Sequence, residues 1–598
     1  MTTTQRLRAL APAILLFATS AFSAPVHLVD EPPASITRLD SGATLVDFGR
    51  VAFGNIRLLP QSNGDHSLAV HFGEDLKNGR VNRRPDGTVR YAKASVVLRG
   101  GETGVVAPAP DGRNTQTGAE HLPPAVLTPS EWGVVLPFRW VEIEGWPGAL
   151  DEKHIVRQAA FASGWDDAAA AFECSDATLN RIWELCRYSI KATTFAGVYV
   201  DGDRERIPYE ADAYLNQLSH YATDHDVRMA RDTFDRLMKH PTWPTEWASH
   251  MIFMAYADYR HTGDTGWLAP RYDSLKPKLL LERARADGLL TSGPEQIKKG
   301  DIVDWPKAER DGFVFTSVNS VVNAFHVRSL QMMAEMAGAV GRTEDATTYT
   351  AMAARAHDAF QNTFFDSSRG AYRDGEGTGH MSQHASLFPL AFGLVPEKRI
   401  SAVLDHVRSR GMACSVYAAQ YLMEGLFMNG AGQHAIELMT APTDRSWRHM
   451  VDSGATITWE AWDTKYKPNQ DWNHAWGAAP ANLLPRFVLG AEVSDPGWKR
   501  ALVRPHPGGL DFAKGKIPTP MGPILVDWKN GASFQMDLRI PDGMTARLDL
   551  PASPGSKGVA INGVPVAAER DGGRWIVNHD VSGRVHIEVN QIEVTSNP

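Results

Sequence analysis

The spacing of apolar residues changes twice along this chain. Between residues 24 and 165, short runs such as 43–48 and 95–99 alternate apolar and polar positions, and clusters of Gly, Pro, Asn and Asp separate them. Such alternation predicts an antiparallel β domain. Short runs of the same kind return after Gly490, for example at 522–528 and 546–550, and predict a second β domain.

The middle of the chain has a helical period instead. In one stretch, apolar residues recur every three or four positions, stop at a glycine and then resume; they are Val327, Leu330, Met333, Met336, Ala337 and Val340, then Gly341, then Tyr349, Met352, Ala356 and Phe360. This pattern predicts a helical hairpin, and similar pairs recur from about residue 172 to 489. A closed ring of hairpins would bury all their apolar stripes.

The length of 598 residues requires several hydrophobic cores, because single cores stop growing near ~250–300 residues. We therefore predict a multidomain protein with an (α/α)6 barrel between N-terminal and C-terminal antiparallel β-sandwich domains. The predicted boundaries are 1–23 for a signal peptide, 24–165 for the first β domain, 166–490 for the (α/α)6 barrel and 491–598 for the second β domain.

The N-terminus is typical of a secretory signal. Arg6 and Arg8 precede an apolar stretch over 9–22, and small residues stand before a possible cleavage at Ala24. The stretch is too short and interrupted for a convincing membrane span, and no later run of about 18 apolar residues follows. We expect an exported protein, periplasmic or secreted, without a membrane span; the sequence carries no signal for a particular oligomeric state.

Charge and cysteine content limit the partners and the disulfide bonds that we expect. The formal charge of −8 offers no basic surface for nucleic acid, so we expect no nucleic-acid partner. Three cysteines leave one unpaired in any pairing scheme, and Cys174 and Cys186 are expected to be small buried side chains.

An acidic cluster, DGDRERIPYEAD, occupies residues 201–212 between two helical stretches. Burial would raise the pKa of some of these acids while Arg204 and Arg206 would lower others, so one carboxyl could stay protonated beside ionised neighbours. A solvated surface loop with local ion pairs is the alternative. Gly202, Pro208 and Tyr209 favour a loop of defined shape.

A second cluster lies in residues 456–480, and five tryptophans fall within thirty residues of sequence that include most of it. Their flat faces suit sugar rings, although packing inside a barrel would also explain them; they are Trp447, Trp459, Trp462, Trp472 and Trp476. Glu460 follows Trp459 directly, so we expect desolvation to raise its pKa and fit it for proton transfer. The alternative is a carboxylate that receives an arginine or a helix N-terminus.

Together the clusters supply the two carboxyl groups that glycoside hydrolysis needs. The motifs HExxH, paired CxxC, GxGxxG, GxxxxGK[ST] and GxSxG are absent from the chain, so we predict neither a metal nor a cofactor.

These residues resemble glycoside hydrolase family 78, the α-L-rhamnosidases. The family motif D-x-x-x-R-E-R-x-G-W-x-G-D is similar to residues 201–212, although the Asp-to-Arg interval is one residue shorter here and Tyr209 replaces the usual Trp. A second motif, A-T-x-x-W-E-x-W followed by N-H and G-A, resembles residues 455–478, and 300–305 resembles GDWxDW with Ile302 for the first Trp.

The resemblance implies an inverting hydrolase that acts on a rhamnose-containing carbohydrate, either a plant glycoside or a fragment of a polysaccharide. It implies that Glu205 is the general acid and Glu460 the general base, with carboxyl groups ~6.5–9.5 Å apart. The residues that it assigns to substrate binding are Asp201, Arg204, Tyr209, Asp212, Trp305, Trp459 and His474.

Two alternatives remain open from the sequence. Because fold does not fix function, the barrel could belong to another glycosidase or to a phosphorylase. A sugar-binding protein without turnover would keep the aromatic residues as well.

Overall fold

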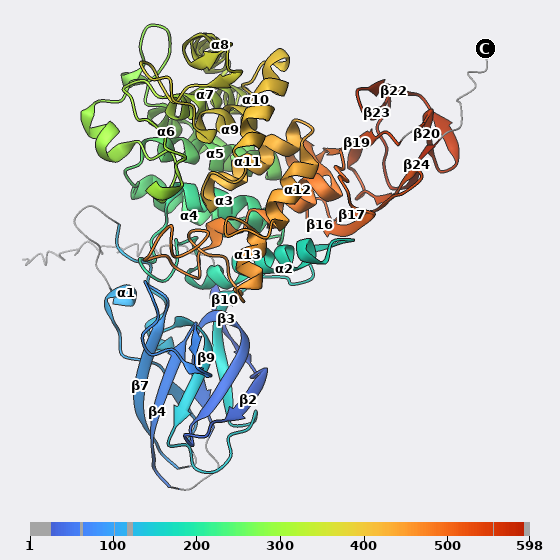
Figure 1. The fold of residues 1–598 in the computed structure, drawn as a ribbon. Helices are drawn as coiled ribbons and strands as arrows, with labels where there is room; N and C mark the ends of the chain where they lie inside the picture. The colour runs from blue at the N-terminus through green and yellow to red at the C-terminus, as the bar shows by residue number, and fades with distance from the viewer. Residues whose placement is uncertain (1–24, 60–63, 101, 116–122, 554, 591–598) are drawn as a thin grey trace, which may run out of the picture.

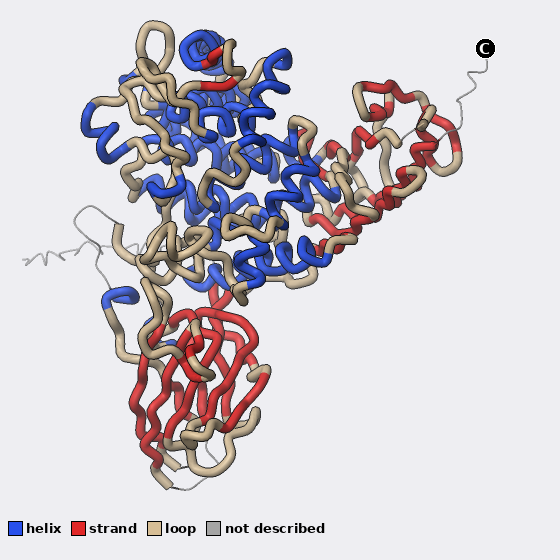
Figure 2. Tube along the Cα trace, viewed as in Figure 1, coloured by secondary structure: helices blue, strands red, loops and turns tan. Residues whose placement is uncertain are grey.

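A computed structural model describes residues 25–59, 64–100, 102–115, 123–553 and 555–590. In chain order, a β domain is followed by a helical barrel and a second β domain, which projects from the side of the barrel (Figure 1). Colouring by secondary structure separates the three parts clearly (Figure 2). This arrangement confirms the predicted fold class. The predicted signal peptide, 1–23, lies outside the described residues.

The N-terminal domain is an antiparallel sandwich-like sheet with the strand order β1-β10-β3-β9-β4-β7, in which β2 and β8 also pair with β3. Its strands are β1 (Val26–Glu31), β2 (Ser35–Arg38), β3 (Thr44–Leu58), β4 (His66–Gly73), β5 (Leu76–Lys77), β6 (Arg80–Val81), β7 (Tyr91–Leu98), β8 (Gly104–Val106), β9 (Leu136–Glu144) and β10 (Ile155–Ala162). Residues such as Val46, Ile56 and Phe138 fill its core. The short helix α1 (Gly112–Thr115) follows β8 in the chain.

Six helical hairpins form the barrel, and each pairs an outer helix with an inner one. The outer helices are α2 (Ala177–Ala192), α4 (Arg228–Lys239), α6 (Thr265–Leu275), α8 (Thr343–Phe364), α10 (Glu397–Ser409) and α12 (Gly432–Thr440), which the short α13 (Trp447–Asp452) follows. The inner helices are α3 (Glu210–Tyr221), α5 (Thr245–Thr262), α7 (Ser320–Ala339), α9 (Gln383–Ala391), α11 (Val416–Met428) and α14 (Pro480–Leu483), which continues as a wider turn over Leu484–Leu489.

The inner helices contact one another in the order α3, α5, α7, α9, α11, α14, and α14 contacts α3 again, so the ring is closed. Inner helices are buried almost all round, whereas outer ones bury a single stripe; in α10 only Val403 and Val407 are buried. The single buried stripe of an outer helix accounts for an apolar residue at every third or fourth position. The predicted hairpin is α7 followed by α8.

Side-chain caps fix where several inner helices begin. Asn319, Ser382 and Ser415 accept hydrogen bonds from backbone amides in the first turns of α7, α9 and α11. The N-terminal ends of the inner helices surround one mouth of the barrel, and the loops that precede them supply the side chains described below.

The C-terminal domain contains two sheets, ordered β11-β16-β17-β18-β24-β20-β21 and β14-β15-β19-β23-β22. Its strands are β11 (Ala171–Cys174), β14 (Ala491–Asp495), β15 (Arg500–Val503), β16 (Phe512–Ile517), β17 (Ile524–Asn530), β18 (Phe534–Arg539), β19 (Thr545–Pro551), β20 (Gly558–Ile561), β21 (Val564–Val566), β22 (Ala568–Asp571), β23 (Arg574–Val577) and β24 (Arg584–Asn590); the small ribbon β12 (Phe365–Asp366) and β13 (Ala371–Tyr372) belongs to the barrel. β11 precedes the barrel in the chain yet pairs with β16, so this sheet links both ends of the helical domain.

Two further predictions concern single features. Cys174 and Cys186 are buried and free, as expected for small core side chains, and Cys414 is buried and free as well. Within the described residues, no helix is both long and apolar enough to cross a bilayer.

Candidate active site

The first acidic cluster forms a tight loop in front of α3. The backbone amide of Asp201 donates to the carbonyl of Ile207, and the Ile207 amide donates to Asp201 Oδ1, each at 2.9 Å. Arg206 adopts a left-handed conformation with φ of 56°, and its amide bonds to Gly202. Asp201 and Asp203 are fully buried, so the loop has a defined shape and is not a solvated surface loop.

Asp203 is held by three arginines and lies at the base of the loop. Arg206 donates to its Oδ1 at 2.6 Å, and Arg90 and Arg113 of the N-terminal domain approach its Oδ2 at 3.3 and 3.2 Å. Burial raises the pKa of Asp203, but these guanidinium groups outweigh burial and lower the pKa overall. Asp203 is therefore a structural anion that ties the loop to the first domain.

Arg204 connects the two predicted catalytic carboxyl groups. Its terminal nitrogens donate to Glu460 Oε2 at 2.6 Å and Oε1 at 3.0 Å, and its Nε stands 3.5 Å from Glu205 Oε1. One guanidinium contacts both carboxyl groups, so the two acids belong to a single site. In the sequence, most of the barrel helices separate the two loops that carry them.

Glu460 is ionised in this setting, which corrects the expected raised pKa. Burial raises the pKa of Glu460, but Arg204 and Lys467 outweigh that effect and lower it to about 2. Lys467 Nζ lies 3.1 Å from Glu460 Oε1, and the Asp471 amide donates to Oε2 at 3.1 Å. The alternative of a carboxylate that receives an arginine is therefore the one that the structure supports.

Glu205 is more open than Glu460. Its side chain is 28% exposed, against 3% for Glu460. The Tyr209 hydroxyl donates to Glu205 Oε2 at 2.5 Å, and the Tyr209 ring packs edge-on against Trp243 and Trp247. Tyr209 thus orients one carboxylate oxygen of Glu205 and leaves the group within reach of a substrate.

The pKa of Asp201 is shifted in the opposite direction to that of Glu460. Burial and the charge of Glu205 raise its pKa well above the ordinary value. Its Oδ2 is buried without a hydrogen-bond partner among the described residues. A neutral carboxyl can both donate to and accept from a sugar hydroxyl.

Asp212 and His474 form a buried pair. His474 Nε2 lies 2.7 Å from Asp212 Oδ1, and the His474 amide donates to the carbonyl of Thr458. Burial raises the pKa of Asp212, and the histidine partly offsets that rise. The His474 ring packs 4.8 Å from that of Trp476, so the structure brings Asp212 and His474 together with the Glu460 loop.

The predicted tryptophans divide into different environments. Trp459 stacks on Trp472 with ring centroids 5.3 Å apart, and both line a cavity of about 240 Å³ against Trp140 of the first domain; its lining includes neither Glu205 nor Glu460. Trp447 and Trp462 are fully buried core residues, so packing explains them.

Trp305 lies in the loop before α7 and is half-buried. The preceding Asp304 is fully buried; its Oδ2 lies 2.6 Å from His384 Nε2 and accepts from the Ser415 amide at 2.9 Å. Since His384 and Ser415 begin α9 and α11, Trp305 stands at the same mouth of the barrel as the acids.

Several site residues escape sequence reasoning. The Arg204 amide donates to Asp471 Oδ2 at 3.2 Å, and the Thr88 hydroxyl donates to Asp471 Oδ1 at 2.8 Å. Asn473 accepts from the Asp203 amide at 2.8 Å and donates to Glu74 Oε1 at 2.9 Å. The residues involved are Asp471, Lys467, Asn473, Thr88 and Glu74; the first three share the tryptophan-rich segment, and no signal links the last two to it.

One group of side chains could hold a cation by geometry. Ligand atoms of Glu460, Asp471 and His474 all lie within 4.8 Å of one another. However, Arg204 and Lys467 already contact both Glu460 oxygens, so a metal ion would compete with two cations at that carboxylate. The set fits a carboxylate held by basic side chains better than a metal centre.

A closed six-hairpin barrel with two carboxyl groups gathered by one arginine defines a protein of the (α/α)6-barrel class. Three family descriptions match in order: the bacterial alpha-L-rhamnosidase concanavalin-like domain at 37–161, the 6 hairpin glycosidase domain at 167–488 and the C-terminal domain at 490–564. The chain therefore belongs to the bacterial α-L-rhamnosidase family.

Curated relatives of the chain are named alpha-L-rhamnosidases, and solved structures share its fold. The alpha-L-rhamnosidase of Alteromonas sp. (strain LOR) is 25% identical over 88% of this chain and 58% of its own, and that of Streptomyces avermitilis is 23% identical over 91% and 52%. The α-L-rhamnosidase structure from Dictyoglumus thermophilum has a TM-score of 0.78 at 18% identity, covering 95% of this chain and 64% of that one.

The Streptomyces avermitilis structure, complexed with L-rhamnose, has a TM-score of 0.76 at 19% identity, covering 95% and 54% of the two chains. The chain thus spans little more than half the length of the curated relatives that it matches.

Proposed function

We propose that the protein is an inverting glycoside hydrolase that releases terminal α-L-rhamnose from rhamnosides. The observation that carries the proposal is the contact of Arg204 with both Glu205 and Glu460. Family membership supports rhamnose as the sugar, and the name of the Alteromonas relative agrees with it.

In the proposed reaction, Glu205 donates a proton to the glycosidic oxygen while the bond from that oxygen to the anomeric carbon breaks. Glu460 accepts a proton from a water molecule, whose oxygen attacks the anomeric carbon from the opposite face. A pKa of about 2 keeps Glu460 ionised at neutral pH, as a base requires. Asp201 and Asp212 would bind sugar hydroxyls, while Tyr209, Trp305 and His474 would form the surrounding wall.

Hydrolysis of 4-nitrophenyl α-L-rhamnopyranoside, followed by proton NMR within the first minutes, tests the proposal. The expected result is release of rhamnose with its β-anomer formed first. Retention of the α-anomer would exclude inversion. Cleavage that requires phosphate would favour a phosphorylase, and binding of L-rhamnose without turnover would favour a sugar-binding protein.

We also propose that the protein is exported. Arg6, Arg8 and the apolar stretch that follows support this proposal. N-terminal sequencing of the protein purified from its native host should find a start near Ala24, whereas an intact Met1 in the cytoplasmic fraction would contradict export.

A further inference from the structure

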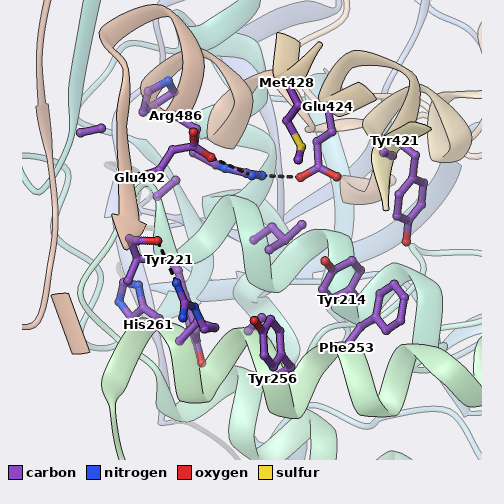
Figure 3. Close-up of a pocket in the computed structure, with 18 of the residues that line it drawn as sticks. Tyr214, Tyr221, Phe253, Tyr256, His261, Tyr421, Glu424, Met428, Arg486 and Glu492 are labelled. Carbon is purple, nitrogen blue, oxygen red and sulfur yellow. Dashed lines mark hydrogen bonds and ion pairs between the residues drawn. The ribbon is translucent and has the colours of Figure 1, made fainter. Parts of the chain in front are cut away.

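A cavity of about 430 Å³ lies toward the C-terminal ends of the inner helices, whereas the acids lie at their N-terminal ends. Figure 3 shows the residues that line the cavity. Late residues of the inner helices line it, including Tyr221 of α3, His261 at the end of α5 and Met428 at the end of α11. Trp498 and Ile517 of the C-terminal domain close one side. A volume of this size is in the range that small organic ligands occupy.

Flat aromatic rings form the wall on the barrel side. Tyr214, Phe253, Tyr256 and Tyr421 surround the space in the close-up, and the Tyr214 and Phe253 rings meet edge-on at 5.5 Å (Figure 3). Tyr214 is only 8% exposed, and its ring and hydroxyl belong to the lining of the cavity. The wall therefore offers apolar ring faces and one hydroxyl for a ligand.

The cavity also contains guanidinium groups that are not neutralised. Arg486 forms ion pairs with Glu424 and Glu492, which the close-up shows as a continuous chain (Figure 3). In the part of the chain that the structure describes, Arg260 and Arg328 form no ion pair.

Both guanidinium groups lie beside the aromatic wall and have neutral partners, and Arg328 donates to Gln331 Oε1 at 3.1 Å. Arg260 donates to the carbonyls of Val493, at 3.1 Å, and Ser494. The Arg328 guanidinium stands 5.7 Å from the Tyr256 ring centroid, while the Tyr256 hydroxyl donates to Glu335 at 2.7 Å. Two cations beside aromatic faces provide the chemistry that recognises an anion with a flat apolar body.

We propose that this cavity is a second binding site, for a small aromatic carboxylate whose ring packs between Tyr214 and Tyr256 and whose carboxylate pairs with Arg328 and Arg260. The site is remote from Glu205 and Glu460, so it goes beyond the proposed hydrolysis. Because Val493 and Trp498 belong to the second β domain, an occupant would contact both domains at their junction.

Isothermal titration calorimetry with 4-hydroxycinnamate on the full chain tests this site. We expect saturable binding, with the uncharged methyl ester binding at least about tenfold more weakly because it cannot pair with a guanidinium. Cyclohexanecarboxylate, which keeps the charge and lacks a flat ring, should also bind more weakly. Saturating L-rhamnose should leave the affinity unchanged, since the sugar would bind at the other mouth.

Arg328→Gln should weaken the binding of 4-hydroxycinnamate at least about tenfold and leave the binding of its methyl ester unchanged. Arg408→Gln is the matched control, because Arg408 is an exposed arginine on the outer helix α10. Equal affinities for acid and ester, unchanged affinity in Arg328→Gln, displacement by L-rhamnose, or no saturable binding would each overturn the proposal. None of these results depends on whether the protein hydrolyses rhamnosides.

Discussion

Arg204 donates a hydrogen bond to each carboxylate oxygen of Glu460, at 2.6 and 3.0 Å, across 256 residues of chain. Paired bonds of this kind fix both the position and the ionisation of a carboxylate. The same guanidinium contacts Glu205, so its removal would affect both halves of the proposed reaction.

Arg204→Gln should therefore change the pH profile as well as the rate. Its charge lowers the pKa of Glu460 to about 2, so Glu460 stays ionised above that pH and is protonated as the pH falls through it. Loss of the charge should move the acidic limb of the profile of kcat/KM against pH to a pH that is ~1–3 units higher. Arg204→Lys keeps the charge but not the paired geometry, and should shift the limb less. If the acidic limb of the Arg204→Gln variant fell at the same pH as that of the wild type, this account would be contradicted.

The two acids should respond differently to the leaving group. Glu205→Gln and Glu460→Gln should each lower kcat by roughly 10²–10⁴. A 4-nitrophenolate leaves without much help from an acid, so Glu205→Gln should lose less activity on that rhamnoside than on an alkyl rhamnoside. Glu460→Gln should lose similar activity on both. The reverse pattern in steady-state assays would exchange the two roles.

The large features of the fold follow from local sequence. The apolar residues around Met333 belong to the inner helix α7, and those after Gly341 form the buried stripe of the outer helix α8, which repeats with every turn. Glu205 and Glu460 could be found since each lies in an unusual local composition and in a recognisable motif.

The supporting residues could not be predicted in this way. Thr88 and Asp471 are 383 residues apart, and an isolated threonine in a β domain has no pattern that relates it to a barrel loop. The predicted rise in the pKa of Glu460 was wrong for a similar reason. Its neighbours in sequence suggest desolvation, whereas Arg204 and Lys467, which reach it through the fold, decide its charge.

Gly202 should tolerate no side chain. A Cβ at this position would lie 2.8 Å from Asp471 Oδ2 and 3.0 Å from Asn473 Oδ1, so the loop that carries Glu460 would have to move. Displacements of about 1 Å can cost ~10² in rate. We expect Gly202→Ala to lower kcat at least about tenfold, as measured with 4-nitrophenyl α-L-rhamnopyranoside.

Gly338 in α7 provides the matched control for this substitution. A Cβ there meets no atom within 4 Å, so Gly338→Ala should keep full activity and gain helix stability. A wild-type kcat in Gly202→Ala would show that the loop of Gly202 and the loop of Asp471 and Asn473 do not pack as closely as the structure shows.

Glu74 should make the stability of the protein depend on pH. It is fully buried, accepts from the Arg90 amide at 2.7 Å and from Asn473 at 2.9 Å, and burial raises its pKa to about 8. The unfolded chain would release this proton near pH ~4.3. The stabilisation from the bound proton is therefore fully present below that pH and is lost as the pH rises through about 8.

Glu74→Gln stays uncharged at every pH and should lack this dependence. Urea unfolding of both proteins between pH 4 and 9 should show the wild type losing stability relative to the variant by up to ~1.4 kcal/mol per pH unit, mainly between pH ~4.5 and 8. All other titrating groups are shared, so the difference isolates Glu74. A constant difference across that range would mean that Glu74 is already ionised at pH 5 and is stabilised by Arg90 and Asn473.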